Sequence, residues 1–247
     1  TPKSGYEFVS YNVIDVNGNQ KTYTSQNLTL TLNDKTHILV LAKSKTFNVS
    51  PQIATGSRSV YAIDKNGNLF AWGSNELGQL GVVTSKTLTK PTFIMTGVVK
   101  VSTSLGGNVG DAPHTLILTD NNTLYSVGNN SFGQLGRTGN TTIPMKVNIS
   151  GKIKDISAGF DHTLVLMESG DLYGCGNNQR GQLGATNFGG EVREFIKIAS
   201  NVKEMVAGRR HTVYVDNQGR AYGLGDNRWK KMTPQSVESY SSPVLLM

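Results

Sequence analysis

The sequence predicts an all-β fold made of repeated units, and two observations carry this prediction. The nonapeptide Gly-Ser-Asn-Glu-Leu-Gly-Gln-Leu-Gly at residues 73–81 returns in closely similar form at residues 128–136 and 176–184. Short apolar runs alternate with turns rich in Gly and Asn along most of the chain, which is typical of many short strands. Self-similarity at a period of about 50 residues indicates an array of supersecondary units.

The clearest strand of each unit begins upstream of the nonapeptide. The four strand starts are Ser59, His114, His162 and His211. The third copy, for example, reads His-Thr-Leu-Val-Leu-Met, then the turn Glu-Ser-Gly-Asp at residues 168–171, then Leu-Tyr-Gly-Cys. Because Gly and Asn adopt turn conformations at low cost, each copy is predicted to form a β-hairpin whose register the turn sets.

Two further extended stretches bring each unit to about four strands. Residues 152–159 and 201–208 alternate apolar and polar side chains before their hairpins, and the stretch at 144–147 precedes them. Leu116 and Leu118 point to one face of their strand while Thr115 and Ile117 point to the other, so neighbours are expected to cover both faces. Repeated four-stranded antiparallel units favour a β-propeller over a sandwich or a solenoid.

The two ends of the chain depart from the repeat. Residues 1–46 lack it but contain a turn at 17–19 and β-type runs at 28–32 and 37–41. We expect a β-rich lead-in segment there, or strands that complete a blade, followed by propeller repeats over residues 47–247. A fourth nonapeptide, residues 225–233, keeps only the first Gly and the Asn, and residues 242–247 look like the start of another unit.

The order His-Thr-Leu-x-Leu, Gly turn, Leu-Tyr and Gly-x-Asn-x-x-Gly-Gln-Leu-Gly resembles the regulator-of-chromosome-condensation repeat. The resemblance covers about residues 47–233 and implies a β-propeller, which in that family usually has seven blades. Four repeats are visible in this sequence, so we expect a fragment, a smaller ring or an open arc completed by partners. An open arc would expose strand edges that proteins generally cover or pair.

The residues that recur in every copy have structural explanations. The Asn and Gln side chains of the nonapeptides are expected to bond turn backbone: Asn75, Asn130, Asn178, Asn227, Gln79, Gln134 and Gln182. His114, His162 and His211 occupy equivalent positions on different units, without the close spacing of metal ligands. No catalytic triad, phosphate loop or dinucleotide fingerprint is identifiable, so we expect no enzyme activity, no metal and no cofactor.

Partner binding is expected where the copies differ, because function concentrates in loops on a repeated scaffold. The insertion at residues 105–113 and the loops after each nonapeptide are such places. The candidate partner-binding residues are Phe132, Phe160, Arg180, Phe188, Arg209, Arg228, Trp229, Lys230 and Lys231. Mixed cationic and aromatic residues of this kind are enriched at interface hot spots.

The function favoured by these features is a non-enzymatic interaction or structural scaffold. We expect it to bind a protein partner or further copies of itself through rim loops. Its Asn, Thr and Ser content favours an extracellular or virion assembly over the cytoplasm. The resemblance also implies a second hypothesis, guanine-nucleotide exchange on a small GTPase, in which the 105–113 insertion would act.

A third hypothesis is chromatin or nucleic-acid binding, and it comes from charge. The chain carries 24 Lys and Arg against 17 Asp and Glu, a formal net charge of +7. These charges are spread along the chain rather than gathered in one basic segment, so nucleic acid is not the favoured partner. No apolar run is long enough to predict a membrane span.

Overall fold

The computed structural model describes residues 50–247, apart from residues 57, 85 and 106–112, and the backbone of three strands nearer the N-terminus. These strands, β1 (Tyr6–Ile14), β2 (Gln20–Tyr23) and β3 (His37–Ser44), form a sheet of their own in the order β2-β1-β3. β3 contains the predicted run at 37–41. The predicted run at 28–32 and turn at 17–19 lie outside the described residues, and the boundary at residue 46 stays a prediction.

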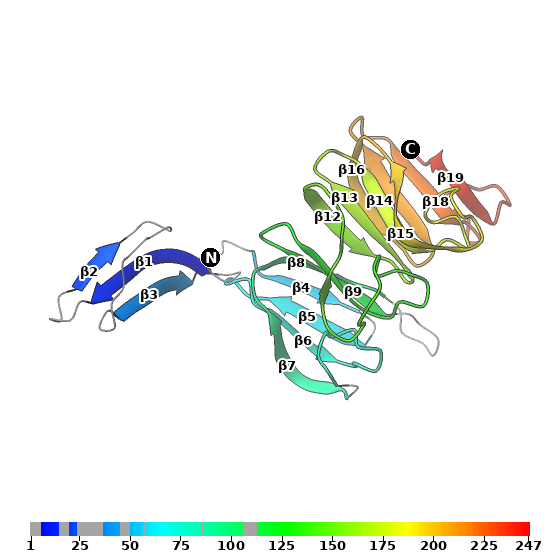
Figure 1. The fold of residues 1–247 in the computed structure, drawn as a ribbon. Helices are drawn as coiled ribbons and strands as arrows, with labels where there is room; N and C mark the ends of the chain where they lie inside the picture. Colours follow the sequence, from blue (N-terminus) through cyan, green and yellow to red (C-terminus); the bar gives the residue numbers. More distant parts are fainter. Residues whose placement is uncertain are drawn as a thin grey trace.

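The other strands form four 4-stranded antiparallel sheets, here called blades 1 to 4 in chain order (Figure 1). Blade 1 contains β4 (Gln52–Thr55), β5 (Ser59–Ile63), β6 (Leu69–Gly73) and β7 (Leu88–Met95). Blade 2 contains β8 (Val98–Thr103), β9 (His114–Thr119), β10 (Leu124–Gly128) and β11 (Met145–Lys146). Blade 3 contains β12 (Ile153–Ala158), β13 (His162–Met167), β14 (Leu172–Asn177) and β15 (Glu191–Ala199). Blade 4 contains β16 (Val202–Ala207), β17 (His211–Asp216), β18 (Ala221–Asp226) and β19 (Ser239–Leu245).

The strands of each blade pair in chain order, and the predicted β-propeller fold of four-stranded blades is confirmed. The boundary between units differs from the expectation in one respect. β11 pairs with β10 and therefore ends blade 2 instead of opening blade 3, and β19 ends blade 4 instead of starting another unit. The reason is that each fourth strand is reached through the nonapeptide loop and folds back onto the hairpin before it.

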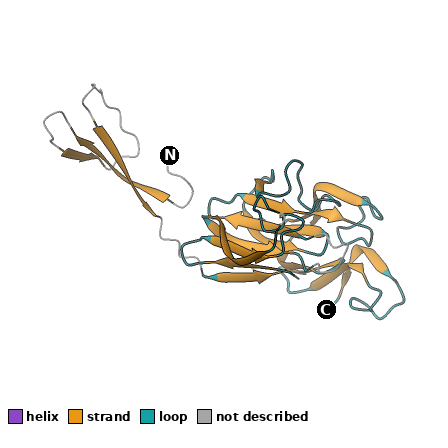
Figure 2. Ribbon diagram, turned by 90° about the horizontal axis from the view of Figure 1, so that it is seen from below, coloured by secondary structure: helices purple, strands orange, loops and turns teal. Residues whose placement is uncertain are grey.

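Apolar side chains hold successive blades together. Tyr61 and Ile63 of blade 1 meet Ile117 of blade 2 in one cluster. Equivalent clusters join blades 2 and 3 and blades 3 and 4. Every residue of β9 and β13 is buried, which confirms that neighbours cover both faces of these strands. Figure 2 shows strands and loops in the described part of the chain, which contains no helix long and apolar enough to cross a membrane.

Within the described residues, the four blades form a row in chain order. Contacts between blades run from β4 and β5 to β8, from β8 and β9 to β12, and from β12 and β13 to β16. Blades 1 and 4 lie at opposite ends of this row (Figure 1). Within the described residues, one face of blade 1 and one face of blade 4 therefore have no neighbouring blade.

Candidate functional site

The loops that differ between the repeats lie on one face of the array. In an antiparallel meander, the loop joining the first two strands and the loop joining the last two strands emerge at the same edge. His162, at the start of β13, accordingly lies opposite Gly176 near the end of β14, and Asn177 lies opposite Glu191 at the start of β15. We call this side the nonapeptide face. It carries every residue predicted to bind a partner.

The Asn at the third position of each nonapeptide holds the loop in shape through its side-chain amide. Asn178 is fully buried, and its Oδ1 accepts a hydrogen bond from the backbone N–H of Leu183 at 2.9 Å. Its Nδ2 donates to the carbonyl oxygens of Gly184 and Thr186 at 2.9 and 2.7 Å. The same Oδ1 bond is made by Asn75, Asn130 and Asn227. The predicted bonding of these amides to turn backbone is confirmed.

The Gln of the nonapeptide stabilises its own turn, and the second Gly allows the following blade to pack closely. Gln182 Oε1 accepts from the backbone N–H of Arg180 at 3.0 Å, within the same turn, as predicted. Gly181 has a φ of +80°, and a Cβ there would lie 2.8 Å from the Cα of Ser241 in blade 4. Gly78 and Gly133 approach the following blade equally closely. This Gly is therefore required both by the left-handed backbone and by the neighbouring blade.

Two of the repeated histidines join adjacent blades. His114 Nε2 lies 2.9 Å from Thr163 Oγ1 in blade 3, and His162 Nε2 lies 3.4 Å from Thr212 Oγ1 in blade 4. Both rings are fully buried. In the described part of the chain, no group of three or more His, Cys, Asp or Glu side chains is arranged to hold a metal ion. These contacts give His114 and His162 a structural role at the blade junctions.

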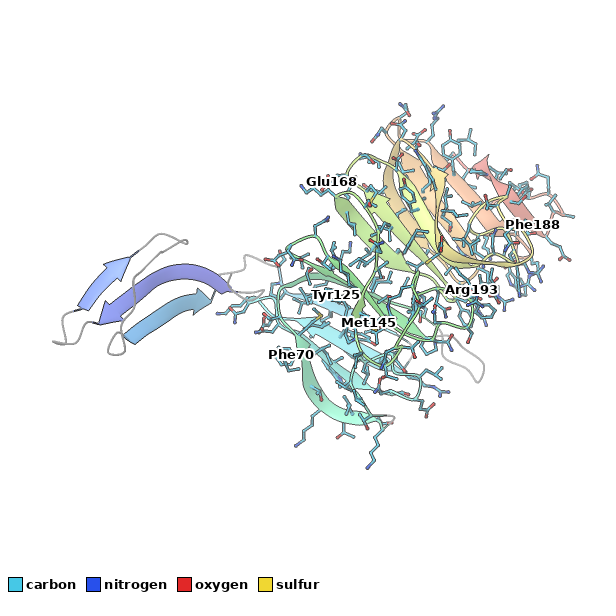
Figure 3. All side chains as sticks on the ribbon, in the orientation of Figure 1. Phe70, Tyr125, Met145, Glu168, Phe188 and Arg193 are labelled. Atoms are coloured by element: carbon cyan, nitrogen blue, oxygen red, sulfur yellow. The ribbon has the colours of Figure 1, made fainter. Side chains whose placement is uncertain are left out.

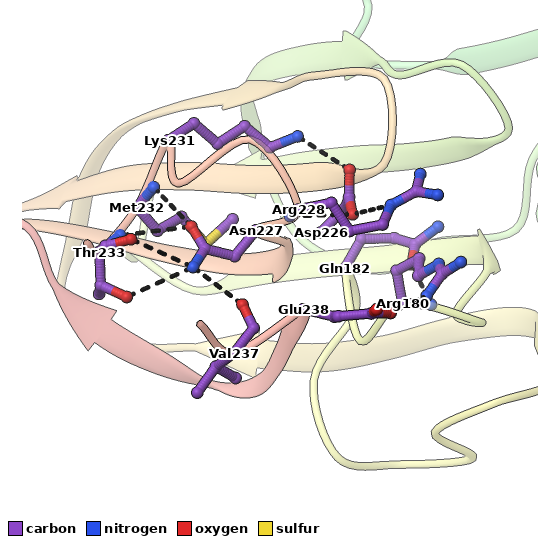
Figure 4. A network of polar contacts seen from close by, with 10 residues as sticks. All are labelled: Arg180, Gln182, Asp226, Asn227, Arg228, Lys231, Met232, Thr233, Val237 and Glu238. Atoms are coloured by element: carbon purple, nitrogen blue, oxygen red, sulfur yellow. Dashed lines mark hydrogen bonds and ion pairs between the residues drawn. The ribbon is translucent and has the colours of Figure 1, made fainter. Parts of the chain in front are cut away.

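The fourth nonapeptide keeps the loop with different chemistry (Figure 4). Asp226 and Lys231 replace Asn129 and Gln134 of the second copy, where Gln134 Nε2 donates to Asn129 Oδ1 at 3.0 Å. The Asp226 carboxylate accepts from Lys231 Nζ at 3.0 Å and from Arg228 Nε at 2.7 Å. Burial raises the pKa of the Asp226 carboxyl, but the hydrogen bonds from Arg228 and Lys231 outweigh it and lower the pKa to about 2. An amide pair has thus become an ion pair at the same place in the fold.

Lys230 replaces the Gly that the internal copies require. It retains a positive φ of +53°, which costs an L-residue roughly 1 kcal/mol. In the described structure no blade follows blade 4, so the close approach seen at Gly181 does not arise here. The relaxed requirement for Gly is consistent with the position of this copy at the end of the row.

Several predicted partner-binding residues are already engaged within the protein. Phe160 is buried under Arg209, whose Cζ lies 4.8 Å above the ring centroid. Arg180 pairs with Glu238 of blade 4 at 3.5 Å. Arg228 and Lys231 bind Asp226, as described above. Phe132 is half-buried.

The remaining predicted residues are available at the surface of the nonapeptide face. Trp229 is 84% exposed and Phe188 is 52% exposed. Lys230, which follows Trp229 in the sequence, is also exposed. The Arg180–Glu238 ion pair links the loop of blade 3, which carries Phe188, to the loop of blade 4, which carries Trp229. The predicted insertion at 105–113 lies mostly outside the described residues.

A groove between blades 2 and 3 was not indicated by the sequence. Its volume is ≈ 920 Å³, and Met145, Tyr173, Arg193 and Phe195 are among its lining residues. Met145 and Arg193 are labelled in Figure 3. The groove accompanies the shortness of β11, which has 2 residues where β15 has 9. The only sequence signal is the shorter β-type run at 144–147.

These features define a β-propeller repeat protein whose blades are fastened by nonapeptide loops. The chain belongs to the family of the Regulator of chromosome condensation (RCC1) repeat. One model of this repeat matches residues 66–108, 121–166 and 169–215, and a second matches residues 52–79 and 153–182. The resemblance seen in the sequence is confirmed.

Similar solved structures show the same fold. Prp20p from Saccharomyces cerevisiae has a TM-score of 0.69 and 24% identity, over 98% of this chain and 64% of that chain. Human WBSCR16 has a TM-score of 0.69 and 19% identity, over 96% of this chain and 66% of that chain. The Prp20p structure is described with its binding properties to Gsp1p and histones, and a second structure contains it bound to Kap60.

Curated relatives match over shorter segments. A Protein RCC2 homolog of Danio rerio is 43% identical over 82 residues, which are 32% of this chain and 15% of that protein. The E3 ubiquitin-protein ligase HERC2 of Homo sapiens is 34% identical over 99 residues, which are 38% of this chain and 2% of that protein. The matched segment is therefore a small part of each of these relatives.

Proposed function

We propose that the chain is a non-enzymatic propeller scaffold that binds a protein partner through its nonapeptide face. The observation that carries the proposal is that the repeated residues of that face are used for structure, whereas the residues that vary are exposed. The repeated Asn, Gln and Gly residues are occupied in holding loops and blades together. Trp229, Phe188 and Lys230 are exposed, and they stand where the copies differ, which is where a repeated scaffold carries its specificity.

The chemistry of these residues suits one kind of partner surface. An exposed Trp and Phe offer large apolar area at small conformational cost, and Lys230 adds a positive charge. We expect the partner to present an apolar pocket bordered by acidic residues. The reported binding of Gsp1p, histones and Kap60 by Prp20p supports protein binding as a use of this fold.

Site-specific photo-crosslinking tests this proposal. A photoreactive phenylalanine analogue is placed at Trp229 or Phe188, and for comparison at Gln218, in the β17–β18 turn on the opposite face. In the cells that make the protein, positions 229 and 188 should capture the same protein and position 218 should not. No adduct at 229 and 188, or the same adducts at 218, would overturn the assignment of the nonapeptide face.

Nucleotide exchange, nucleic-acid binding and the extracellular or virion setting stay predictions. No feature of the described residues favours any of them over protein binding. A nucleotide-release assay on a small GTPase and a salt-dependent gel shift test the first two. Acceleration of nucleotide release would also contradict the proposed absence of enzyme activity.

A further inference from the structure

The groove between blades 2 and 3 contains a half-buried cation that binds only neutral groups. Arg137 lines the groove, and its Nε and Nη2 donate to the hydroxyl and carbonyl oxygens of Ser126 at 3.0 and 2.6 Å. Its Nη1 donates to the carbonyl oxygens of Thr138 and Asn140. Burial lowers the pKa of Arg137, and no carboxylate among the described residues offsets this effect. A half-buried charge without a counter-ion favours an anionic ligand.

Arg137 and Ser126 are both departures from the repeat. The aligned residues are Ala71, Gly174 and Gly223 for Ser126, and Val82, Ala185 and Pro234 for Arg137. Two residues that differ from all other copies therefore contact each other at one place in the fold. The other three blades form without this pair, and positions that vary on a repeated scaffold are where binding is expected.

The other charged residues of the groove are paired or point elsewhere. Arg193 faces blade 2 and is ion-paired with an acid of its own strand, β15. Side chains alternate along a strand, so Glu194 points to the opposite face of β15. Val147 is buried between blades 2 and 3, so the preceding Lys146 likewise points away from blade 3. Among the described side chains that enter the groove, Arg137 therefore carries the unmatched charge.

The backbone of blade 2 along the groove is unpaired on its outer side. The N–H of Val147 donates to the carbonyl oxygen of Leu124 at 2.8 Å, so the N–H and C=O of Lys146 point away from β10. Within the described part of the chain, the backbone N–H groups of residues 148–150 make no hydrogen bond. Lys146 and residues 148–150 line the groove. An extended peptide adds to such an edge through main-chain hydrogen bonds, and its alternate side chains enter the adjoining groove.

We infer that the groove between blades 2 and 3 binds an extended peptide segment of another protein, with an acidic residue two positions from an apolar one. Residues two apart in an extended chain point to the same side. The acidic side chain accepts from Arg137, which has one of its five N–H donors left. The apolar side chain packs between Met145 and Phe195, which lie half-buried in the groove. The volume of ≈ 920 Å³ is sufficient for both side chains.

Fluorescence polarisation with two labelled octapeptide pools and the full chain tests this inference. The first pool carries Glu and Leu two positions apart, in either order, with Ala, Ser and Thr elsewhere. In the second pool Gln replaces Glu. We expect a dissociation constant on the order of 10–100 µM for the Glu pool. The Gln pool should bind at least about 10-fold more weakly, because a charged hydrogen bond is lost. Binding of neither pool below about 1 mM, or equal binding of both, would overturn the inference.

Variants locate the binding in the groove. Arg137→Gln keeps an amide donor but removes the charge, so the two pools should bind it equally. Met145→Glu should weaken binding of the Glu pool at least about 10-fold, whereas the neutral Met145→Gln should change it less. Gln218→Glu adds the same charge in the β17–β18 turn on the opposite face and should leave binding unchanged. Circular dichroism checks that each variant is folded. A preference for Glu that persists in Arg137→Gln would contradict the assigned role of Arg137.

A competition experiment distinguishes a peptide from a small acid. Because N-acetylglutamate amide offers the carboxylate without the extended backbone or the Leu, it should displace the labelled Glu pool only at a concentration at least about 10-fold above that of the unlabelled pool. Displacement at the same concentration would show a site for small anions, and the peptide would be the wrong ligand. The inference does not depend on the proposed function, since Trp229 and Phe188 do not line this groove.

Discussion

The third and fourth nonapeptides form the same loop from different residues. In both, the Asn Oδ1 accepts a backbone N–H, from Leu183 at 2.9 Å in blade 3 and from Met232 at 2.9 Å in blade 4. Gly181 has been replaced by Lys230. The loop of blade 3 packs against blade 4, whereas the loop of blade 4 has no following blade in the described structure. The comparison indicates that the hydrogen bonds of the Asn determine the conformation of the loop. The Gly is needed because the neighbouring blade leaves no room for a side chain.

The largest expected effect tests the Asn that both loops share, Asn178 in the third copy and Asn227 in the fourth. Asn178→Ala removes three hydrogen bonds and leaves a buried N–H unsatisfied, so it should lower the free energy of unfolding by about 3–4 kcal/mol. Asn227→Ala should have a similar effect in the fourth copy. Urea denaturation of both variants measures this. A loss below about 1 kcal/mol for Asn227→Ala would show that the fourth loop has become independent of its amide.

The next largest expected effect tests the position at which the two loops differ, Gly181 in the third copy and Lys230 in the fourth. Gly181→Ala introduces a Cβ at positive φ and 2.8 Å from the Cα of Ser241, so it should cost about 2–3 kcal/mol. Lys230→Ala, at the aligned position, should change stability by less than about 0.5 kcal/mol, because a Cβ is already present there. If the two variants cost the same, the neighbouring blade is not the reason for the Gly.

The features of the fold that followed from the sequence are those held by local contacts. The strand starts and hairpin turns recur in each copy, and the Asn and Gln bonds close within one loop. The ends of the blades were harder to place. Residues 242–247 resemble a first strand in composition, and their assignment to β19 depends on pairing with β18 across a 12-residue loop. Composition does not distinguish these pairings, since both strands are short and apolar.

The candidate site was predictable as a set of loops but not residue by residue. Phe160 lies under Arg209, and Arg180 binds Glu238 with a separation of 58 residues. Such partners depend on how blades stack, which one copy of the repeat does not show. The exposure of Ile53 was not predicted for the same reason, because its position is buried in blades 2 and 3, where Val101 and Ile156 occupy it.

A smaller effect concerns the ion pair that replaces an amide pair. The pKa of Asp226 is lowered to about 2 in the folded protein, below its usual 3.8, so the unfolded chain binds the proton more readily between these values. The stabilisation from Asp226 is therefore present above about pH 4 and lost as the pH falls toward 2, by an amount on the order of 1 kcal/mol. Asp226→Asn restores the residue type of the third copy. Urea denaturation from pH 6 to 2.5 should show the difference between the two proteins shrinking as the pH falls, and a constant difference would contradict the ion-pair explanation.

The smallest expected effect is an increase in the free energy of unfolding. Lys230→Gly removes a side chain from a backbone at φ +53°, and the relieved strain should exceed the added freedom of the unfolded chain by about 0.5 kcal/mol. Lys230→Ala retains the Cβ and should give no gain, so it is the matched control for thermal denaturation. A gain with Gly alone would show that Lys230 is retained at a cost to stability, as expected of a residue that serves the exposed surface beside Trp229. Equal stability of the Gly and Ala variants would show that the backbone of this loop carries no strain at Lys230.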